Sequence, residues 1–179
     1  MSLKIVKPQR KIPSLLFSTI MPDSKKINPS AERNRDPILN VLRTTLELSR
    51  PLKCLEIASG SGTHVGHFAE HLPSVTWQPS DFDPENLPSL RAYTRESKNI
   101  LDPIVIDISK ILDIDNFRPD IILCINMIHI SPYEAAIGVI NGAGRRLVPG
   151  GFLYFYGPFR KDGGHTSPSN AAFDESLQS

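Results

Sequence analysis

The chain has 179 residues, and its 20 lysines and arginines nearly balance its 19 aspartates and glutamates, which leaves a net charge of +1. This length is enough for one domain with a real core, and the balanced charge argues against the broad positive field of a nucleic-acid-binding protein. Since no apolar run reaches the length of a bilayer span, no membrane partner is expected either. Cys54 and Cys124 each lie in an apolar run, which predicts buried free thiols and a cytoplasmic setting, with the nucleus as the alternative.

The N-terminal segment differs in composition from the rest of the chain. Residues 1–22 contain basic residues and no acid, and prolines interrupt any helix there. The prolines and the few serines argue against an organelle-targeting signal. We therefore expect a disordered basic arm over residues 1–29 and a folded domain over residues 30–179.

Helical and strand-like patterns alternate along the remainder of the chain. The first predicted helix covers residues 30–48, with a break or second start at Pro37 that Asp36 would cap. Strands that alternate with helices form βαβ units and a parallel sheet, so we predict an α/β, Rossmann-like domain of about five strands with helices on both faces. The predicted strands cover residues 53–58, 75–79, 104–108, 120–126 and 152–157, the helices between them cover 63–72, 87–97 and 133–147, and a loop over 161–170 precedes a short helical tail.

A small-residue loop follows the first predicted strand, where ligands of parallel sheets bind. Gly60 and Gly62 lie in this loop, and Glu56 lies inside the strand before it. A carboxylate repels phosphate but favours a cation such as S-adenosylmethionine, which carries a sulfonium and an ammonium group. Val65 stands where a dinucleotide-binding loop has its third glycine, which disfavours NAD. The alternative is a tight strand-to-helix turn without a ligand.

Two acidic residues mark the ends of the next two predicted strands. Asp81 follows Gly62 by nineteen residues, and a carboxylate at this place accepts hydrogen bonds from ribose hydroxyls. Its alternative role is to cap a helix or turn. Asp107 ends the third predicted strand, where it would border an adenine, although aspartate is also common at strand ends.

Asn126 and His129 follow the fourth predicted strand and would lie at the mouth of the crevice. His129 is the candidate general base for an acceptor hydroxyl, amine or thiol, with simple packing as the alternative. His64, His67 and His71 recur on one predicted helix, but no carboxylate or cysteine completes a ligand set, so we expect no metal.

Four sequence blocks, at residues 55–62, 77–81, 124–132 and 156–159, resemble the methyltransferase-like 26 family, and residues 32–37 are similar to its entry helix. This is a small group of class I, S-adenosylmethionine-dependent methyltransferase-like proteins whose substrate is not established. The resemblance spans about residues 30–178. It implies a cofactor site in which the methionine part is flanked by Glu56, Ala58, Ser59, Gly60 and Gly62. In the same site Asp81 holds the ribose, Asp107 and Ile108 border the adenine, and Asn126 lies near the sulfonium. The resemblance also implies that the site is closed by Arg33, Asn34 and Arg35, with an arginine meeting the cofactor carboxylate.

The resemblance also implies more chain than the sequence contains. Class I domains of this kind carry two more strands after the fifth, whereas this sequence stops at Ser179. We therefore expect a shortened form whose fifth strand is an exposed, aromatic-rich edge open to self-association. The resulting hypothesis is a methyltransferase acting on a small molecule or a protein side chain. The alternatives are a non-catalytic module that binds S-adenosylmethionine and, less favoured, an NAD-dependent oxidoreductase.

Overall fold

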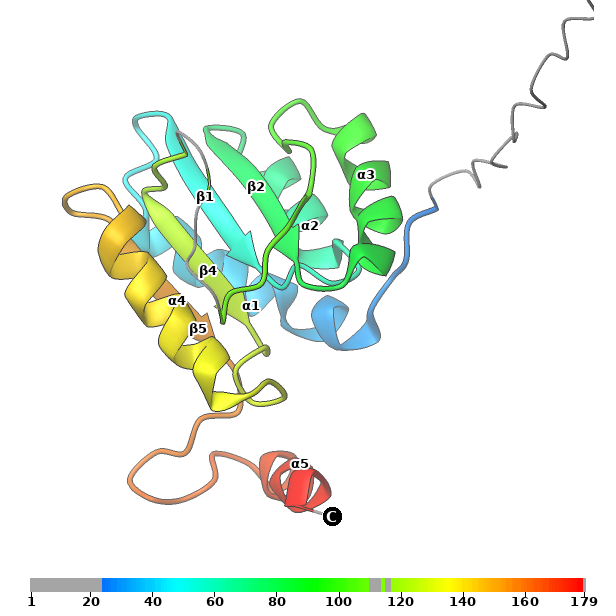
Figure 1. The fold of residues 1–179 in the computed structure, drawn as a ribbon, viewed down its shortest axis with the longest axis vertical. Helices are drawn as coiled ribbons and strands as arrows, with labels where there is room; N and C mark the ends of the chain where they lie inside the picture. The colour runs from blue at the N-terminus through cyan, green and yellow to red at the C-terminus, as the bar shows by residue number, and fades with distance from the viewer. Residues whose placement is uncertain (1–23, 110–113, 115–116, 179) are drawn as a thin grey trace, which may run out of the picture.

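Five parallel strands form a single sheet in the order β3-β2-β1-β4-β5 (Figure 1). The computed structural model describes residues 24–109, 114 and 117–178. All neighbouring strands run in the same direction, which confirms the predicted α/β, Rossmann-like fold. The strands are β1 (Leu52–Ile57), β2 (Val75–Asp81), β3 (Ile104–Val105), β4 (Ile121–Ile125) and β5 (Phe152–Tyr156).

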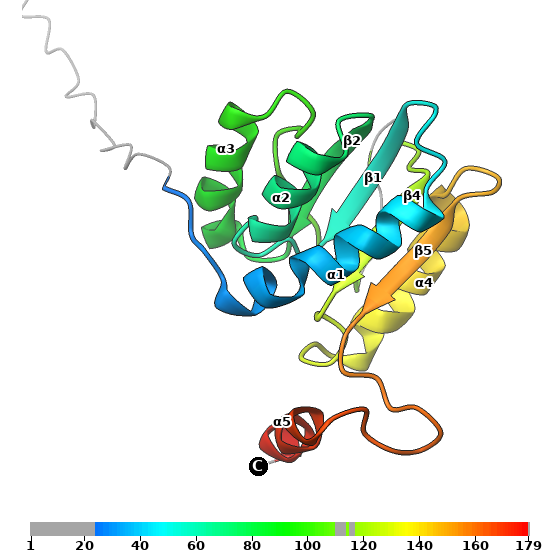
Figure 2. The same ribbon diagram turned by 180° about the vertical axis from the view of Figure 1, so that it is seen from behind.

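Helices cover both faces of the sheet, as Figures 1 and 2 show from opposite sides. On one face α1, α2 and α3 pack on a core that includes Phe68 and Trp77, whose rings are tilted by 35° to each other. On the other face α4 packs through Val139 and Ala143. The helices are α1 (Pro29–Thr45), α2 (Thr63–His71), α3 (Leu87–Glu96), α4 (Tyr133–Arg146) and α5 (Pro168–Gln178), and a short 3₁₀ turn, η1 (Pro84–Asn86), precedes α3.

Helix α1 runs without interruption through Pro37, so the predicted break there is wrong. Asn28, rather than Asp36, caps the helix, because its side chain accepts hydrogen bonds from the backbone N–H groups of Ser30 and Ala31. Proline removes one internal hydrogen bond, but the buried stripe that includes Ile38 holds the helix against the sheet. Tertiary packing therefore overrides the local preference.

The contacts of the domain begin before residue 30. The backbone N–H of Lys26 donates to Ser89 Oγ at 2.8 Å, and that of Asn28 donates to Thr63 Oγ1 at 3.1 Å. Residues 24–28 thus connect α1 to α2 and α3. The rest of the predicted arm, residues 1–23, lies outside the described residues.

The third strand is much shorter than predicted. Only Ile104 and Val105 pair with β2, and the chain then turns away from the sheet. This turn carries Ile108 under α4, where a Cβ built on Gly138 would lie 1.8 Å from the Ile108 carbonyl oxygen. Asp107 and Ile108 consequently lie beyond the strand, in a turn pressed against α4.

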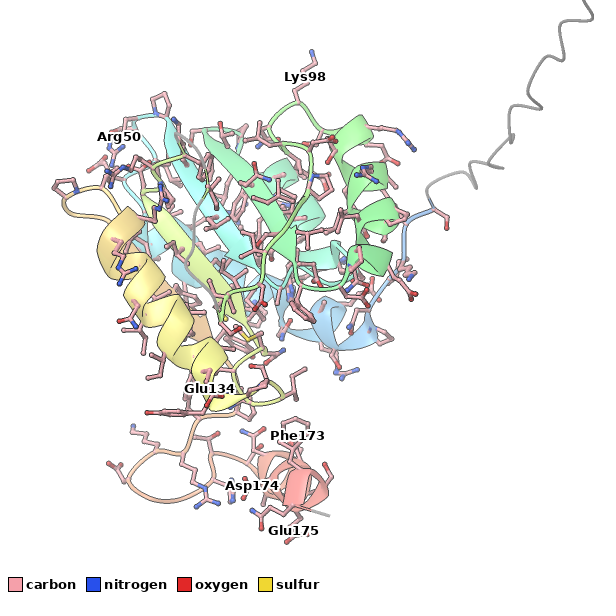
Figure 3. The ribbon with its side chains drawn as sticks, viewed as in Figure 1. Arg50, Lys98, Glu134, Phe173, Asp174 and Glu175 are labelled. Carbon is pink, nitrogen blue, oxygen red and sulfur yellow. The ribbon has the colours of Figure 1, made fainter. Side chains whose placement is uncertain are left out.

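The chain after β5 is held loosely. Strand β5 pairs with β4, and no other described strand pairs with its outer edge. Helix α5 has no buried residue and lies beyond the carboxyl ends of the strands, with Phe173 on the side toward the sheet and Glu175 on the far side (Figure 3). Within the described part of the chain, no helix has the length and apolar character needed to cross a membrane.

Candidate functional site

Two residues with unusual backbone conformations lie at the carboxyl ends of the two central strands. Ala58, after β1, has a φ of 55°, and Asn126, after β4, has a φ of 57°. A positive φ is uncommon for residues other than glycine and is concentrated at functional sites. The loop from Ala58 also contains Gly60 and Gly62, with φ values of 54° and 88°. The carboxyl ends of β1 and β4 therefore share a constrained backbone.

Asp81, at the end of β2, is bonded to the loop after β1. Its carboxylate accepts hydrogen bonds from the Gly60 N–H at 2.7 Å, the Asp83 N–H at 2.9 Å and Asn86 Nδ2 at 3.1 Å. Ser59 fastens the same loop to β2, because its N–H donates to Ser80 O and its Oγ accepts from Ser80 N–H. Ser59 is buried and so acts as a tie between strands.

Glu56 is buried beneath this loop with only 1% of its surface exposed, and its Oε2 has no hydrogen-bond partner. Burial raises the pKa of Glu56 to about 8, while a hydrogen bond from Ser59 opposes this shift and the charge of Asp81 adds to it. At this pKa the carboxyl is neutral at pH 7, and a positive charge placed beside its unpaired oxygen would favour the ionised form. The residues present therefore fit a cationic cofactor such as S-adenosylmethionine better than a phosphate.

A cavity of about 280 Å³ opens where β1 and β4 meet the turn after β3. The sequence predicted three of its residues, Ala58, Asp107 and Ile108, and the structure brings them together here. Asp107 accepts hydrogen bonds from the Ser109 N–H at 3.2 Å and its Oγ at 2.6 Å. The sequence analysis missed several other lining residues, which include Phe82, Ile106, Met127 and Pro132.

Phe82 carried a signal that could have revealed it. It is an aromatic residue directly after Asp81, beyond the end of a strand, and its side chain is 68% exposed. An exposed aromatic ring beside a ligand cleft is a common binding surface for a planar group. The apolar lining of this cavity, with few polar groups, fits an adenine ring.

A second cavity, of about 710 Å³, lies on the other side of Asn126. Arg33 and Asn34 from α1 line it, together with Tyr156 at the end of β5 and Phe173 from α5. Arg33 donates to Ser30 Oγ at 2.8 Å, and Asn34 Oδ1 is 2.7 Å from His64 Nε2. Two of the three residues predicted to close the site are therefore beside it.

Arg35, the third residue predicted to close the site, does not line this cavity. It lines a separate cavity of about 810 Å³ among α1, α2 and α3, together with His67 and Tyr93. Two residues along a helix turn the side chain to nearly the opposite side, so Arg33 and Arg35 cannot face the same cleft. Arg35 instead lies 3.5 Å from Glu32.

His129 lies beside the 710 Å³ cavity but does not line it. Its Nε2 is buried and has no hydrogen-bond partner, and its ring meets Phe159 edge-on at 4.8 Å. The ring lies against Gly157, where any side chain would clash, because a Cβ there would be 2.1 Å from Nε2. Burial lowers the pKa of His129, so the ring is neutral near pH 7. The structure thus gives His129 a basic nitrogen within the wall of the cleft.

The strand order β3-β2-β1-β4-β5, with helices on both faces of the sheet, is a Rossmann-like α/β fold. Solved methyltransferases share it: an O-methyltransferase family protein from Burkholderia thailandensis is 20% identical, with a TM-score of 0.61 over 83% of this chain and 45% of that one. The methyltransferase SibL is 20% identical, with a TM-score of 0.64 over 82% and 41%. PKMT2 from Rickettsia typhi, in complex with AdoHcy, is 20% identical, with a TM-score of 0.52 over 65% and 23%.

The chain spans less than half the length of each of these three solved proteins, and the likeness concerns the fold. Its family is more specific. The chain belongs to the DUF938 family, whose members are described as proteins of unknown function, and the family model matches residues 25–179.

Proposed function

We propose that this protein binds S-adenosylmethionine at the carboxyl ends of β1, β2 and β4 and transfers its methyl group to an acceptor. The observation that carries the proposal is Glu56, a buried carboxyl with an unpaired oxygen beneath a small-residue loop. When bound, the cofactor supplies an electrophilic methyl group for an in-line displacement. The task of the protein is then alignment, which needs a rigid cradle more than a strong acid or base.

Each part of the cleft has a proposed partner in the cofactor. Glu56 and the loop containing Ala58, Gly60 and Gly62 flank the methionine part, and Asp81 accepts from the ribose. The 280 Å³ cavity, which Asp107 and Ile108 border, takes the adenine. The second cleft, beyond Asn126, holds the acceptor, with Arg33 meeting the cofactor carboxylate. The proposal includes the relation to the methyltransferase-like 26 family, and an acceptor that is a small molecule or a protein side chain.

A second candidate is a module that binds the cofactor without turnover. His129 favours it, because the Nε2 of the one predicted general base is enclosed in the wall and does not line the acceptor cleft. An acceptor whose nucleophile is already unprotonated needs no base, so both functions fit the same geometry.

Calorimetric titration tests the binding step. We expect S-adenosylmethionine and S-adenosylhomocysteine to bind and NAD to give no signal. Asp81→Asn keeps an oxygen for the Gly60 N–H but removes the charge, which weakens cofactor binding by about 1.5–3 kcal/mol. Asp83→Asn is the matched control, since Asp83 is exposed and only caps η1. Equal affinity in both variants would refute the ribose assignment.

Methyl transfer is tested by incubating a cell extract with the protein and isotopically labelled S-adenosylmethionine. A labelled product that is absent with Asp81→Asn supports the enzyme. Cofactor binding without any labelled product supports the module.

A further inference from the structure

The outer face of α4 carries large apolar side chains in solvent. Tyr133, Ile137 and Ile140 are 75%, 39% and 53% exposed. Their spacing of four and three residues places them on one side of the helix. The opposite side already meets the sheet through buried Val139 and Ala143. No other described element lies on the outer side of α4 in either view (Figures 1 and 2).

Gly144 continues this line, one turn after Ile140. A Cβ built on Gly144 would meet nothing within 4 Å, so the helix has open space above its backbone there. We call Tyr133, Ile137, Ile140 and Gly144 the α4 stripe. Its four–three–four spacing is that of the seam between two paired helices. The stripe has a bulky ring at one end and an open space at the other.

Two antiparallel copies of the α4 stripe complement each other. If Ile137 of one copy lies against Ile140 of the second, the same register places Tyr133 over Gly144 at both ends. The largest side chain then meets the smallest, and the two isoleucine layers fill the centre. Such a pairing is two-fold symmetric, so the same surface serves both copies.

The charges beside the stripe agree with this arrangement. Glu134 lies in the first turn of α4 and Arg145 in the last. Figure 3 shows Glu134 at the end of α4 nearest to α5. Antiparallel pairing brings Glu134 of each copy beside Arg145 of the other, whereas parallel pairing would place like charges together.

We propose that the α4 stripe is a docking surface for a second copy of this chain, paired antiparallel about a two-fold axis between Ile137 and Ile140. A single helix pair buries less area than the roughly 1,600 Å² of a standard stable interface, so the dimer is weak and reversible. This surface is separate from the proposed cofactor cleft.

Sedimentation velocity over a concentration series tests the proposal. The wild type is expected to shift from monomer toward dimer as its concentration rises to hundreds of micromolar. Ile140→Glu should remain monomeric throughout, with unchanged circular dichroism, because it is half exposed. Val41→Glu is the matched control: Val41 is also an exposed apolar residue on a helix, 42% exposed on α1, and its variant should dimerise like the wild type.

A charge exchange tests the antiparallel register. Glu134→Arg and Arg145→Glu should each weaken dimerisation several-fold, and the double variant should restore it. A wild type that stays monomeric overturns the proposal. So does a dimer that persists in Ile140→Glu, which would form through another surface such as the open edge of β5. Ile140→Glu could also lose thermal stability while its sedimentation mass stays equal to that of the wild type. This result would mean that the chain itself covers the α4 stripe, and it also overturns the proposal.

Discussion

The two halves of the cleft are built differently. On the proposed cofactor side, Glu56, Ser59 and Asp81 are all buried, and hydrogen bonds join the loop after β1 to the end of β2. On the proposed acceptor side, every side chain of β5 is half-buried and α5 has no buried residue. Interior packing therefore fixes the proposed cofactor cradle, whereas surface contacts such as that between Arg160 and Asp174 hold the acceptor side.

The sharpest test of this contrast compares two phenylalanines. Phe68 is fully buried beside Trp77, and Phe68→Ala should lower the free energy of unfolding by about 3–5 kcal/mol. Phe173 on α5 is 38% exposed, and Phe173→Ala should change it by only about 0.5 kcal/mol. Denaturant titration measures both. Similar losses in the two variants would show that α5 is as firmly packed as the core.

The buried carboxyl on the cofactor side makes stability depend on pH. Glu56 holds its proton up to a pKa of about 8 in the folded state, against a usual value of 4.5. Between these values the folded state binds more protons than the unfolded state, so stability falls as pH rises and levels off above the folded pKa. Relative to Glu56→Gln, the wild type should lose about 1.4 kcal/mol per pH unit in this window. Unfolding curves at pH 5 and pH 7 give the difference; parallel pH profiles would contradict it.

Two glycines of α4 allow a comparison of the packed side of that helix with its exposed side. Gly138→Ala forces a methyl group against the Ile108 carbonyl and should cost about 1–3 kcal/mol. Gly144→Ala meets open space and should stabilise the helix by about 0.5–1 kcal/mol. Thermal unfolding of the two variants should move in opposite directions. Since Ile108 borders the 280 Å³ cavity, only Gly138→Ala should also alter cofactor affinity.

The smallest expected effect is a change in ligand affinity that distinguishes the two sides of α1. Arg33→Gln should weaken S-adenosylhomocysteine binding by about 1 kcal/mol, or about fivefold, because an exposed arginine loses its proposed carboxylate partner. Methylthioadenosine lacks that carboxylate and should bind both proteins equally. Arg35→Gln, which changes a residue of the other cavity, is the control. If Arg35→Gln had the larger effect, the assignment of the two arginines would be reversed.

The periodicity of the sequence predicted the sheet and its helices, because apolar strands such as β4 are buried on both faces and leave a plain pattern. The pattern failed where distant contacts decide. Pro37 remains inside a helix because the sheet holds Ile38, and the third strand ends early because α4 binds the turn at Ile108. Local sequence contains neither contact.

The candidate site shows the same division. The sequence predicted that Gly60 and Asp81 lie close together because strand ends converge in a parallel sheet, and the structure joins the Gly60 N–H to the Asp81 carboxylate at 2.7 Å. The resemblance placed Arg33 and Arg35 together, but helix geometry separates them. Phe82 and Met127 were missed because spacing alone does not show which apolar residues after a strand turn into a cavity.

The left-handed backbone of Ala58 has a consequence for how the cradle comes into being. A φ of 55° is unfavourable for alanine, so the hydrogen bonds that join this loop to the end of β2 must impose it. The loop cannot adopt this conformation before β1 and β2 have paired, and it cannot leave the conformation while the two strands remain paired. The recognition surface is thus a by-product of sheet assembly, and the Gly60 amide should exchange with solvent deuterium only as fast as these two strands come apart.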